Sequence, residues 1–433
     1  MNNLAEVYLW GTRIGYLQLK SDLPYAQFEY DKDFVSSIQG KGIELSPLKM
    51  PISNRIYEFP GLEESFHGVP GLLADSLPDK FGNAIINQWL ASQSKTEEDF
   101  NVIDRLCYTG SRGMGALEYK PAISNDASEN DIVNVGEMVQ FASDILNKRA
   151  LVEIDMSKAT YSQLLQLGTS AGGARAKATI AWNEATNEVI SGQTDLRPGY
   201  GYWLMKFDGV SKNGDHDLED APEYTMIEYA YYLMAVKAGL VMNECRLFEE
   251  GSRRHFMTKR FDRVDGDKIH MQTLSALAHI DYNTPRLCSY EQAAAYMRQL
   301  GLGQNEIEQF YRRMVFNVIA VNRDDHVKNI SFLMDRNGEW SLSPAYDITF
   351  AYSPGNKWLK AHQMTINGKS EWITIDDLLL SGQVMGLTKK KCKNIIADVR
   401  EVVITFPEIA GSIGIREQTI AAIEEVKKQL IMK

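Results

Sequence analysis

Residues 312–347 read RRMVFNVIAVNRDDHVKNISFLMDRNGEWSLSPAYD. The segment RRMVFNVIAV ends a helical pattern, NRDDHVKN is polar, and ISFLM, DRNG and EWSL together predict a two-stranded hairpin with its turn. The hairpin leads into an acidic loop that ends at Asp347. This order of helix, polar loop, hairpin and acidic loop decides how we interpret the rest of the chain.

Three side chains in this stretch occur in the order that phosphoryl transfer from a nucleotide requires. Asp324 and Asn329 have the D-x-x-x-x-N spacing of a kinase catalytic loop, and Asp347 follows the hairpin. One Asp must orient the substrate hydroxyl, the Asn must hold Mg²⁺ nearby, and the second Asp must bridge metal and phosphates. The spacing alone is common, and an Asp/Asn-rich turn with a capping role is the alternative, but that alternative does not explain Asp347. The stretch therefore predicts an ATP- and Mg²⁺-dependent phosphotransferase.

Lys206 lies in a β-rich region upstream, where four strands are predicted, with one helix between the second and the third. Its own strand is otherwise apolar, and a lone inward-facing ammonium would be costly there unless it met phosphate or carboxylate. Glu228 in the helix is the natural partner, as in the Lys–Glu pair that positions nucleotide phosphates in kinases. A lysine that extends from a strand end to solvent is the alternative. The predicted strands are KATIAW, GYWLMKF, ECRLF and RHFMTKRF, and the helix is EYTMIEYAYYLMAVKAGL.

A glycine-rich loop, GTSAGGARAK at residues 168–177, precedes the first of these strands. It offers backbone amides free of side-chain obstruction, including those of Gly172 and Gly173, which phosphate approach needs. The loop matches neither Walker A nor G-x-G-x-x-G, so a flexible interlobe loop is an equally good interpretation.

Residues 257–260 follow an apolar strand and lead toward a more helical region. A hinge at this place would give backbone hydrogen bonds to adenine, so we expect Met257 and Lys259 beside the nucleotide. Phe261 either packs on the base or lies in the core. Strand signal almost vanishes after this point.

Bulk composition limits the function classes. The chain has 433 residues, 44% of them hydrophobic, which is enough for two or three packed units. The net charge of −11 disfavours direct nucleic-acid binding. Four scattered cysteines fit a reducing compartment, and no signal peptide or membrane-spanning run is evident. We expect a cytoplasmic protein without membrane association.

Polar residues 121–135 indicate a surface connection. We therefore predict an α+β protein with a two-lobed, protein-kinase-like core and an additional N-terminal subdomain. The expected divisions are an N-terminal α+β subdomain at residues 1–122, a β-rich small lobe at 123–258 and a helical large lobe at 259–433.

Separated motifs of this sequence agree with one family in the same order. Together they resemble the HipA family of bacterial Ser/Thr kinases, the toxin halves of type II toxin–antitoxin modules, and the likeness runs over nearly the whole chain. The motifs are FHGVPGLLADSLPDKFGN, YTGSRGMGALEY, TSAGGARAKATIAW, YWLMKF, TKRFDR, RDDHVKN and SPAYDIT.

The resemblance implies a role for each residue of the predicted site. Asp324, two residues before the histidine of D-x-H-x-K-N, is the implied catalytic Asp, and its neighbour Asp325 is the residue most easily confused with it. Asn329 and Asp347 would hold Mg²⁺. The implied contacts with ATP come from Lys206, Gln272 and Lys328.

The resemblance also implies regulation by autophosphorylation of a serine in the glycine-rich loop. The matching residue is Ser170, and Thr169 is adjacent. Two departures from the family pattern occur. Lys259 stands where the hinge usually has an acidic residue, and the loop reads GGARAK where the founding toxin has the more polar G-A-Q-E-K.

Family members commonly bind a small helix-turn-helix antitoxin similar to HipB, and through it operator DNA. The resemblance thus implies an antitoxin partner, indirect DNA contact and a protein substrate, for which an aminoacyl-tRNA synthetase is the family's best-known example. Two alternatives stay open. One is a catalytically silent corepressor that holds an antitoxin on DNA, and the other is a small-molecule kinase on the same fold.

Overall fold

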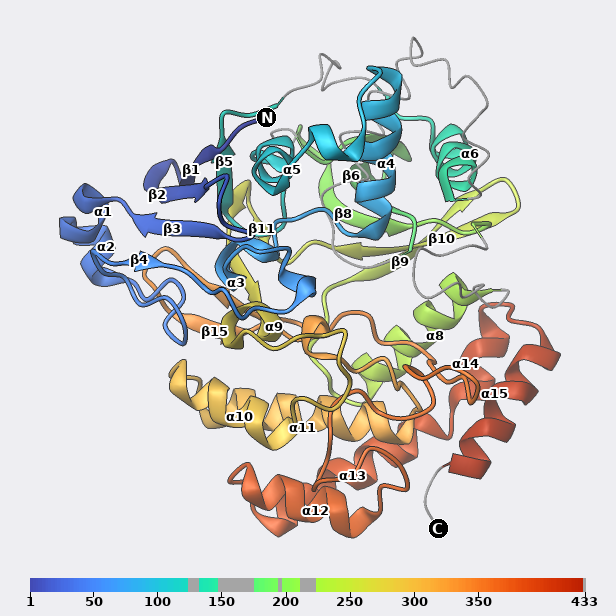
Figure 1. Ribbon diagram of the computed structural model, residues 1–433. Coiled ribbons are helices and arrows are strands. Elements are labelled where there is room, and N and C mark those ends of the chain that lie inside the picture. Colours follow the sequence, from blue (N-terminus) through green and yellow to red (C-terminus); the bar gives the residue numbers. More distant parts are fainter. Residues whose placement is uncertain (124–131, 147–174, 194–196, 211–222, 431–433) are drawn as a thin grey trace. The chain divides into compact units, whose positions relative to one another are not determined.

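The computed structural model describes residues 1–123, 132–146, 175–193, 197–210 and 223–430 (Figure 1). The chain divides into two compact units. The first comprises residues 1–46, 50–225 and 244–271, and the second comprises residues 47–49, 226–243 and 272–433. The mixed α+β fold predicted from the sequence is confirmed. The three-part division predicted from the sequence is finer than these two units and stays a prediction.

The first unit begins with a five-stranded antiparallel sheet in the order β4-β3-β2-β1-β5. Alternation of buried and partly exposed side chains along β3 is typical of a strand with one face on a core. A turn at Gly11, with φ of 80°, joins the first two strands. The strands are β1 (Leu4–Leu9), β2 (Thr12–Leu19), β3 (Ala26–Tyr30), β4 (Ile56–Tyr57) and β5 (Leu117–Lys120).

Among the described residues of the first unit, the helices are short apart from α4 and α6, which have 13 and 12 residues. They are α1 (Lys32–Ser36), α2 (Ile38–Gly42), α3 (Gly71–Ala74), α4 (Lys80–Ser92), α5 (Val102–Thr109) and α6 (Val135–Leu146).

A second antiparallel sheet in this unit has the order β7-β6-β8-β10-β9. It contains the four predicted strands, and β7 is an additional strand that the sequence analysis missed. A two-stranded ribbon, β11 (Arg263–Val264) with β12 (Asp267–Lys268), follows. The strands of the sheet are β6 (Lys177–Asn183), β7 (Glu188–Ser191), β8 (Gly201–Lys206), β9 (Cys245–Glu250) and β10 (Arg253–Lys259).

Helices α4 and α6 pack against this second sheet and share one hydrophobic core with it (Figure 1). Phe81 and Ile85 come from α4, and Ile180, Trp203 and Met257 come from the strands. Since α4 lies in the sequence before β5, the N-terminal segment contributes directly to the core of the sheet that follows it. The two sheets therefore belong to one packed body.

A buried ion cluster joins the segment after β10 to the turn before β5. Arg260 donates to both oxygens of Asp262, with Nε–Oδ1 2.9 Å and Nη2–Oδ2 2.7 Å, and Arg263 Nη1 lies 2.7 Å from Oδ2. The Gly115 amide donates to the same oxygen at 2.7 Å, and Arg263 donates to the carbonyl oxygens of Gly113 and Gly115 at 3.0 and 2.9 Å. Two sequence motifs that lie far apart thus form one cluster.

Electrostatics keep this cluster ionised. Burial would raise the pKa of Asp262, but the two guanidinium groups and the Gly115 amide outweigh burial and hold that pKa well below its ordinary value. Burial lowers the pKa of Arg263 to about 10, although Asp262 opposes the change. Only glycine suits position 115, because φ is +77° and a Cβ would meet the Met271 backbone nitrogen at 3.0 Å.

The second unit is mostly helical. Its longest helix, α11, contacts α10 and α13, and α12 contacts the same two helices. The predicted hairpin is confirmed as β14 with β15, and β13 joins it as a third strand that was not predicted. Among the helices that the structure describes, none combines the length and apolarity needed to cross a bilayer. The strands are β13 (His270–Thr273), at the boundary between the units, β14 (Ser331–Met334) and β15 (Trp340–Leu342).

The bounds of the helices outside the first 146 residues follow from the same structure. They are α8 (Tyr224–Lys237), α9 (Leu274–Ala278), α10 (Tyr290–Gln299), α11 (Gln304–Ile319), α12 (Ile375–Val384), α13 (Lys389–Val403), α14 (Phe406–Ser412) and α15 (Glu417–Leu430).

His255 on β10 makes the stability of the first unit depend on pH. Its side chain is fully buried, and Nδ1 accepts a hydrogen bond of 2.9 Å from the Asp208 amide, so the ring is neutral with its proton on Nε2. Burial lowers the pKa of His255 to about 4, although Asp208 and Glu250 oppose the change. An unfolded histidine titrates near 6.5, so the unfolded state binds more protons between these two values. Stability therefore falls as the pH drops through this window.

We predict that His255→Gln reduces this acid sensitivity. Between about pH 7.5 and about pH 5.5, His255 should cost the wild-type protein roughly 1.4 kcal/mol of unfolding free energy, which urea unfolding followed by tryptophan fluorescence measures. The variant should lose correspondingly less over the same interval, whatever its stability at neutral pH. His67→Asn, at an exposed histidine, is the matched control and should retain the wild-type slope. Equal slopes for all three proteins would contradict the account.

Candidate active site

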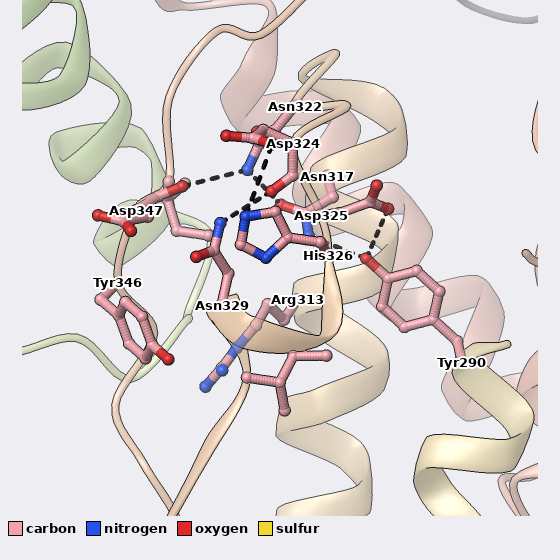
Figure 2. A pocket seen from close by; sticks show the side chains of 12 residues that line it. Tyr290, Arg313, Asn317, Asn322, Asp324, Asp325, His326, Asn329, Tyr346 and Asp347 are labelled. Carbon is pink, nitrogen blue, oxygen red and sulfur yellow. Dashed lines mark hydrogen bonds and ion pairs between the residues drawn. The ribbon is translucent and has the colours of Figure 1, made fainter. Parts of the chain in front are cut away.

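The predicted catalytic loop starts where α11 ends. Val321 has a φ of 59°, which breaks the helix, and the Tyr231 hydroxyl donates to the Ala320 carbonyl oxygen at 2.7 Å. The chain then forms an open loop and a short 3-10 helix, Val327–Asn329, before it enters β14. This loop and the acidic loop after β15 line one pocket (Figure 2).

The pocket brings together the three residues that the sequence predicted for phosphoryl transfer. Asp324, Asn329 and Asp347 all line it, and all belong to the second unit. Figure 2 shows the Asp347 and Asn329 side chains on the same side of the loop. Two carboxylates and an amide therefore line one pocket.

Asp324 and Asp325 are adjacent in sequence but lie in opposite environments. The Asp324 side chain is 45% exposed, and its Oδ1 lies 3.8 Å from His326 Nε2. The Asp325 side chain is only 1% exposed. Because a carboxylate that accepts a substrate proton must be reachable, the geometry favours Asp324 for that task and leaves Asp325 to a supporting one.

The buried Asp325 side chain holds the loop in place through hydrogen bonds. Its Oδ2 accepts hydrogen bonds from the Tyr290 hydroxyl at 2.8 Å and lies 2.9 Å from His362 Nδ1, while its Oδ1 accepts the Gln363 amide at 2.7 Å. Asn317 on α11 donates to the same tyrosine oxygen at 3.0 Å. These contacts tie the loop to α10, α11 and the segment before α12, so the backbone on either side of Asp325 is held in place.

A hydrogen bond to the backbone of Asp324 orients the Asn329 side chain. Its Nδ2 donates to the Asp324 carbonyl oxygen at 2.8 Å, which fixes the amide so that Oδ1 faces away from that contact. Figure 2 shows this oxygen turned to the side on which Asp347 lies. The five-residue separation of Asp324 and Asn329 is thus closed by one side chain-to-backbone hydrogen bond.

Asp347 has a backbone conformation that few non-glycine residues adopt. Its φ is 53°, in the left-handed region, where strain is commonly stored at functional sites. The Asn322 side chain lies between the two loops, since its Nδ2 is 3.1 Å from Asn317 Oδ1 and 3.5 Å from the Asp347 carbonyl oxygen. The neighbouring Tyr346 donates its hydroxyl proton to the Lys328 carbonyl oxygen at 2.8 Å. The acidic loop and the catalytic loop are therefore joined directly.

These residues fit a magnesium ion. Mg²⁺ prefers carboxylate and carbonyl oxygens and keeps several waters, so it needs few protein ligands. Asn329 offers a preoriented amide oxygen and Asp347 a half-buried carboxylate in the same pocket. Within the described ranges, no group of three or more His, Cys, Asp or Glu side chains is arranged to hold a metal ion.

The residues predicted to bind nucleotide are divided between the two units. Lys206 is 7% exposed at the end of β8, in the first unit, and its Nζ lies 5.6 Å from the centroid of the Phe256 ring. Glu228 is 1% exposed on α8, in the second unit. Their predicted pairing stays a prediction.

The other predicted nucleotide contacts have varied environments. Met257 is fully buried in the core beneath α4 and α6, which leaves only its backbone for such a contact. Lys259 is exposed, Phe261 is half-buried and Gln272 is fully buried on β13. Lys328 lies on the catalytic loop, with Nζ 4.6 Å from the Tyr282 ring centroid. Thr169, Ser170, Gly172 and Gly173 of the glycine-rich loop lie outside the described residues.

Sequence reasoning missed the residues that support the loop. Tyr290 and His362 lie 35 and 37 residues away from Asp325 along the chain, and only the fold brings them to it. No spacing in the sequence marks them. Asn322, the first residue of the polar segment NRDDHVKN, also lines the pocket and was not singled out.

Family models match two parts of the chain. A model of the HipA-like C-terminal domain matches residues 169–406, and a model of the HipA N-terminal domain matches residues 5–120. A curated protein of Haemophilus influenzae that carries the name "Putative kinase" is 28% identical over 162 residues, which cover 33% of this chain. The chain spans about half, 47%, of the length of that relative.

A solved structure shares the fold. A chain of the Shewanella oneidensis MR-1 toxin–antitoxin complex of HipA, HipB and operator DNA is similar with a TM-score of 0.68 and 15% identity, over 98% of this chain and 95% of that one. The Helicobacter pylori proinflammatory kinase CtkA reaches a TM-score of only 0.31 at 13% identity, over 52% of this chain and 92% of that one. At such identities a likeness concerns fold alone, and the second likeness is too weak to carry an argument.

We predict that the two adjacent aspartates differ sharply in their contribution to stability. Asp325→Asn removes the charge that three donors share and should cost about 2–4 kcal/mol of unfolding free energy, because charged hydrogen bonds contribute about 1.5–3 kcal/mol each. Asp324→Asn alters a half-exposed side chain and should change stability by less than about 0.5 kcal/mol. Urea unfolding of both variants beside wild type measures the difference. Similar losses in the two variants would refute the assignment of Asp325 as the anchor.

Proposed function

This chain belongs to the HipA family, and we propose that it is an ATP- and Mg²⁺-dependent serine/threonine protein kinase. The observation that carries the proposal is the pocket in which Asn329 donates to the backbone of Asp324 while Asp347 lines the same wall. Phosphoryl transfer needs positioned groups and little covalent chemistry from the protein, and these three residues are of the required types.

Each residue has a distinct task in the proposed reaction. Asp324 accepts the proton of a substrate hydroxyl, whose oxygen then attacks the γ-phosphorus of ATP, and the bond to the β-phosphate oxygen breaks to release ADP. Its half-exposed position suits a protein substrate that approaches from solvent. The Asn329 amide and the Asp347 carboxylate hold the metal, which when bound offsets charge on the phosphates.

On the nucleotide side, we infer that Lys206 contacts the phosphates and that Glu228 pairs with it. Burial of the Lys206 ammonium supports this inference, because an ammonium in such a place calls for an anion. Gln272, Lys328 and the hinge from Met257 to Phe261 would contact the rest of ATP.

Partners and regulation follow from family membership rather than from the pocket. We propose a small HipB-like helix-turn-helix antitoxin as partner, with DNA contacted through it, because the similar Shewanella HipA chain comes from a complex with HipB and operator DNA. The net charge of −11 disfavours direct contact of this chain with DNA, which agrees with contact made by the antitoxin instead. We further propose autophosphorylation at Ser170 or Thr169, and a protein target whose modification halts growth.

A catalytically silent corepressor is the competing function. Such a scaffold needs a surface for the antitoxin but no ordered arrangement of Asp324, Asn329 and Asp347. The hydrogen bond that fixes the Asn329 amide supports the kinase, because a scaffold has no need of it.

Intact-mass spectrometry after incubation with ATP and Mg²⁺ tests the proposal. Wild-type protein should gain the mass of phosphate, and peptide mapping should locate it at Ser170 or Thr169. Asp324→Asn should bind ATP but gain phosphate at least about 100-fold more slowly. Asp376→Asn, at an exposed aspartate on α12, is the matched control and should behave as wild type. No phosphate on wild type, together with no ATP binding, would favour the corepressor.

A further inference from the structure

A second pocket of the second unit adjoins the candidate active site. His326 of the catalytic loop lines both pockets, and its Nε2 lies 3.8 Å from Asp324 Oδ1 (Figure 2). The next residue of the loop, Val327, also lines the second pocket. The rest of the lining comes from the segment between α9 and α10, within residues 280–288, and from Gln363. We call this hollow the flanking pocket.

The segment that forms the flanking pocket is fixed to the catalytic loop. The Arg286 amide donates to the Gln363 carbonyl oxygen at 2.7 Å, and the Gln363 amide donates in turn to the buried Asp325 Oδ1 at 2.7 Å. The Tyr282 ring centroid lies 6.0 Å from that of His326. The same buried carboxylate that holds the catalytic loop therefore also fixes the flanking pocket beside it.

The Gln363 side chain supplies a hydrogen-bond acceptor at this pocket. Gln363 is 4% exposed, and its Nε2 donates to the Trp358 carbonyl oxygen at 2.9 Å. Its Oε1 is buried and accepts no hydrogen bond from any residue that the structure describes. A buried acceptor without a donor costs free energy, so a ligand that brings a donor is favoured. The backbone N–H of an extended polypeptide is such a donor.

Arg286 supplies the exposed charge of the flanking pocket. It lines the pocket and is exposed, and it forms no ion pair within the described part of the chain. The carboxylate of Asp281 also belongs to the lining, but the residue is only 7% exposed. Its two oxygens accept the Asn283 amide at 2.9 Å and the Thr284 hydroxyl at 2.7 Å. The pocket therefore presents a guanidinium to solvent and keeps its carboxylate within its own turn.

We propose that the flanking pocket binds an extended segment of the protein substrate beside its phosphoacceptor serine or threonine, and that Arg286 selects an acidic residue in that segment. This inference rests on the proposed function and narrows its substrate class to acidic sites. Residues of an extended chain are about 3.3 Å apart, so the acidic residue lies within about three positions of the acceptor.

Charge and hydrogen bonding divide the recognition between two groups. Gln363 Oε1 accepts a backbone N–H of the segment, a contact that any sequence can make. Arg286 discriminates, because a guanidinium forms paired, charge-assisted hydrogen bonds with a carboxylate and repels lysine or arginine. The acceptor hydroxyl then reaches the exposed Asp324, which lies directly across His326 from the pocket.

The test uses synthetic peptides that carry one serine or threonine and have Asp, Ala or Lys at each neighbouring position in turn. With ATP and Mg²⁺, wild type should have a kcat/KM about 10-fold higher with Asp than with Ala at the best position, as expected for one charged hydrogen bond. Arg286→Ala should abolish this preference, and Arg286→Glu should reverse it in favour of Lys. Arg286→Lys, which keeps the charge, should retain most of it.

Gln363→Met should raise KM about 5-fold for every peptide and leave the ratio of Asp to Ala peptides unchanged, because it removes a contact with backbone alone. Arg400→Glu, at an exposed arginine of α13 in the same unit, is the matched control for charge reversal and should keep the wild-type preference. Circular dichroism checks folding, and Arg286→Gln replaces Arg286→Glu should the latter not fold.

An equal loss of kcat/KM for all peptides in the Arg286 variants would mean a merely structural arginine and overturn the inference. Wild type that shows no preference for Asp, or that phosphorylates itself but no peptide, would overturn it as well while the proposed function stands. If wild type binds no ATP and transfers phosphate neither to itself nor to any peptide, the proposed function fails too.

Discussion

The buried carboxylate of Asp325 is the group on which the candidate site depends. It accepts from Tyr290 on α10 and from Gln363, and it contacts His362, the residue before Gln363, so two separate parts of the second unit hold it. A loop of polar residues has little hydrophobic surface of its own to hold it, so its conformation must come from such contacts. With Asp325 fixed, Asp324 is presented to solvent and Asn329 can reach back to its carbonyl oxygen. Phosphoryl transfer requires catalytic groups that are already in position. Asp325 therefore positions its neighbour Asp324, the proposed catalytic residue, by holding the loop that carries both.

A comparable buried carboxylate organises the first unit. Asp262 joins two arginines from the segment after β10 to the turn that contains Gly113 and Gly115. That segment continues through β11 and β12 to Gln272, which we expect beside the nucleotide. Together with the packing of α4 on the second sheet, this cluster makes the N-terminal residues part of the same body as the β-rich lobe. Removing them would therefore disturb more than a separate appended domain.

Local patterns in the sequence were sufficient for the central elements of the fold. The helix before the catalytic loop, the hairpin after it and four strands of the second sheet follow from periodicity over a few residues. β7 was missed because its four residues are too short for a pattern, and β13 because its pairing partner lies far along the chain.

The site was predictable only in part. Asp324, Asn329 and Asp347 lie close in sequence, so spacing could identify them. The supporting roles of Tyr290 and His362 depend on tertiary contacts across more than thirty residues, which no local signal encodes. Asp324 and Asp325 are distinguished by burial, since the first side chain is 45% exposed and the second 1% exposed. The sequence alone cannot show which of two adjacent aspartates the fold buries. The predicted hinge at residues 257–260 stays a prediction, and the part that Arg260 and Asp262 play in the buried cluster was not predicted from the sequence.

We propose that the Asp324 pocket transfers phosphate from ATP to protein hydroxyls. The most direct test is transfer of label from [γ-³²P]ATP to proteins of a heat-treated bacterial extract, in which other kinases are inactive. Wild type should label one or a few proteins on serine or threonine, only with Mg²⁺, and Asp324→Asn should label none. Labelling that is equal in the two proteins, or that persists without Mg²⁺, would contradict the account.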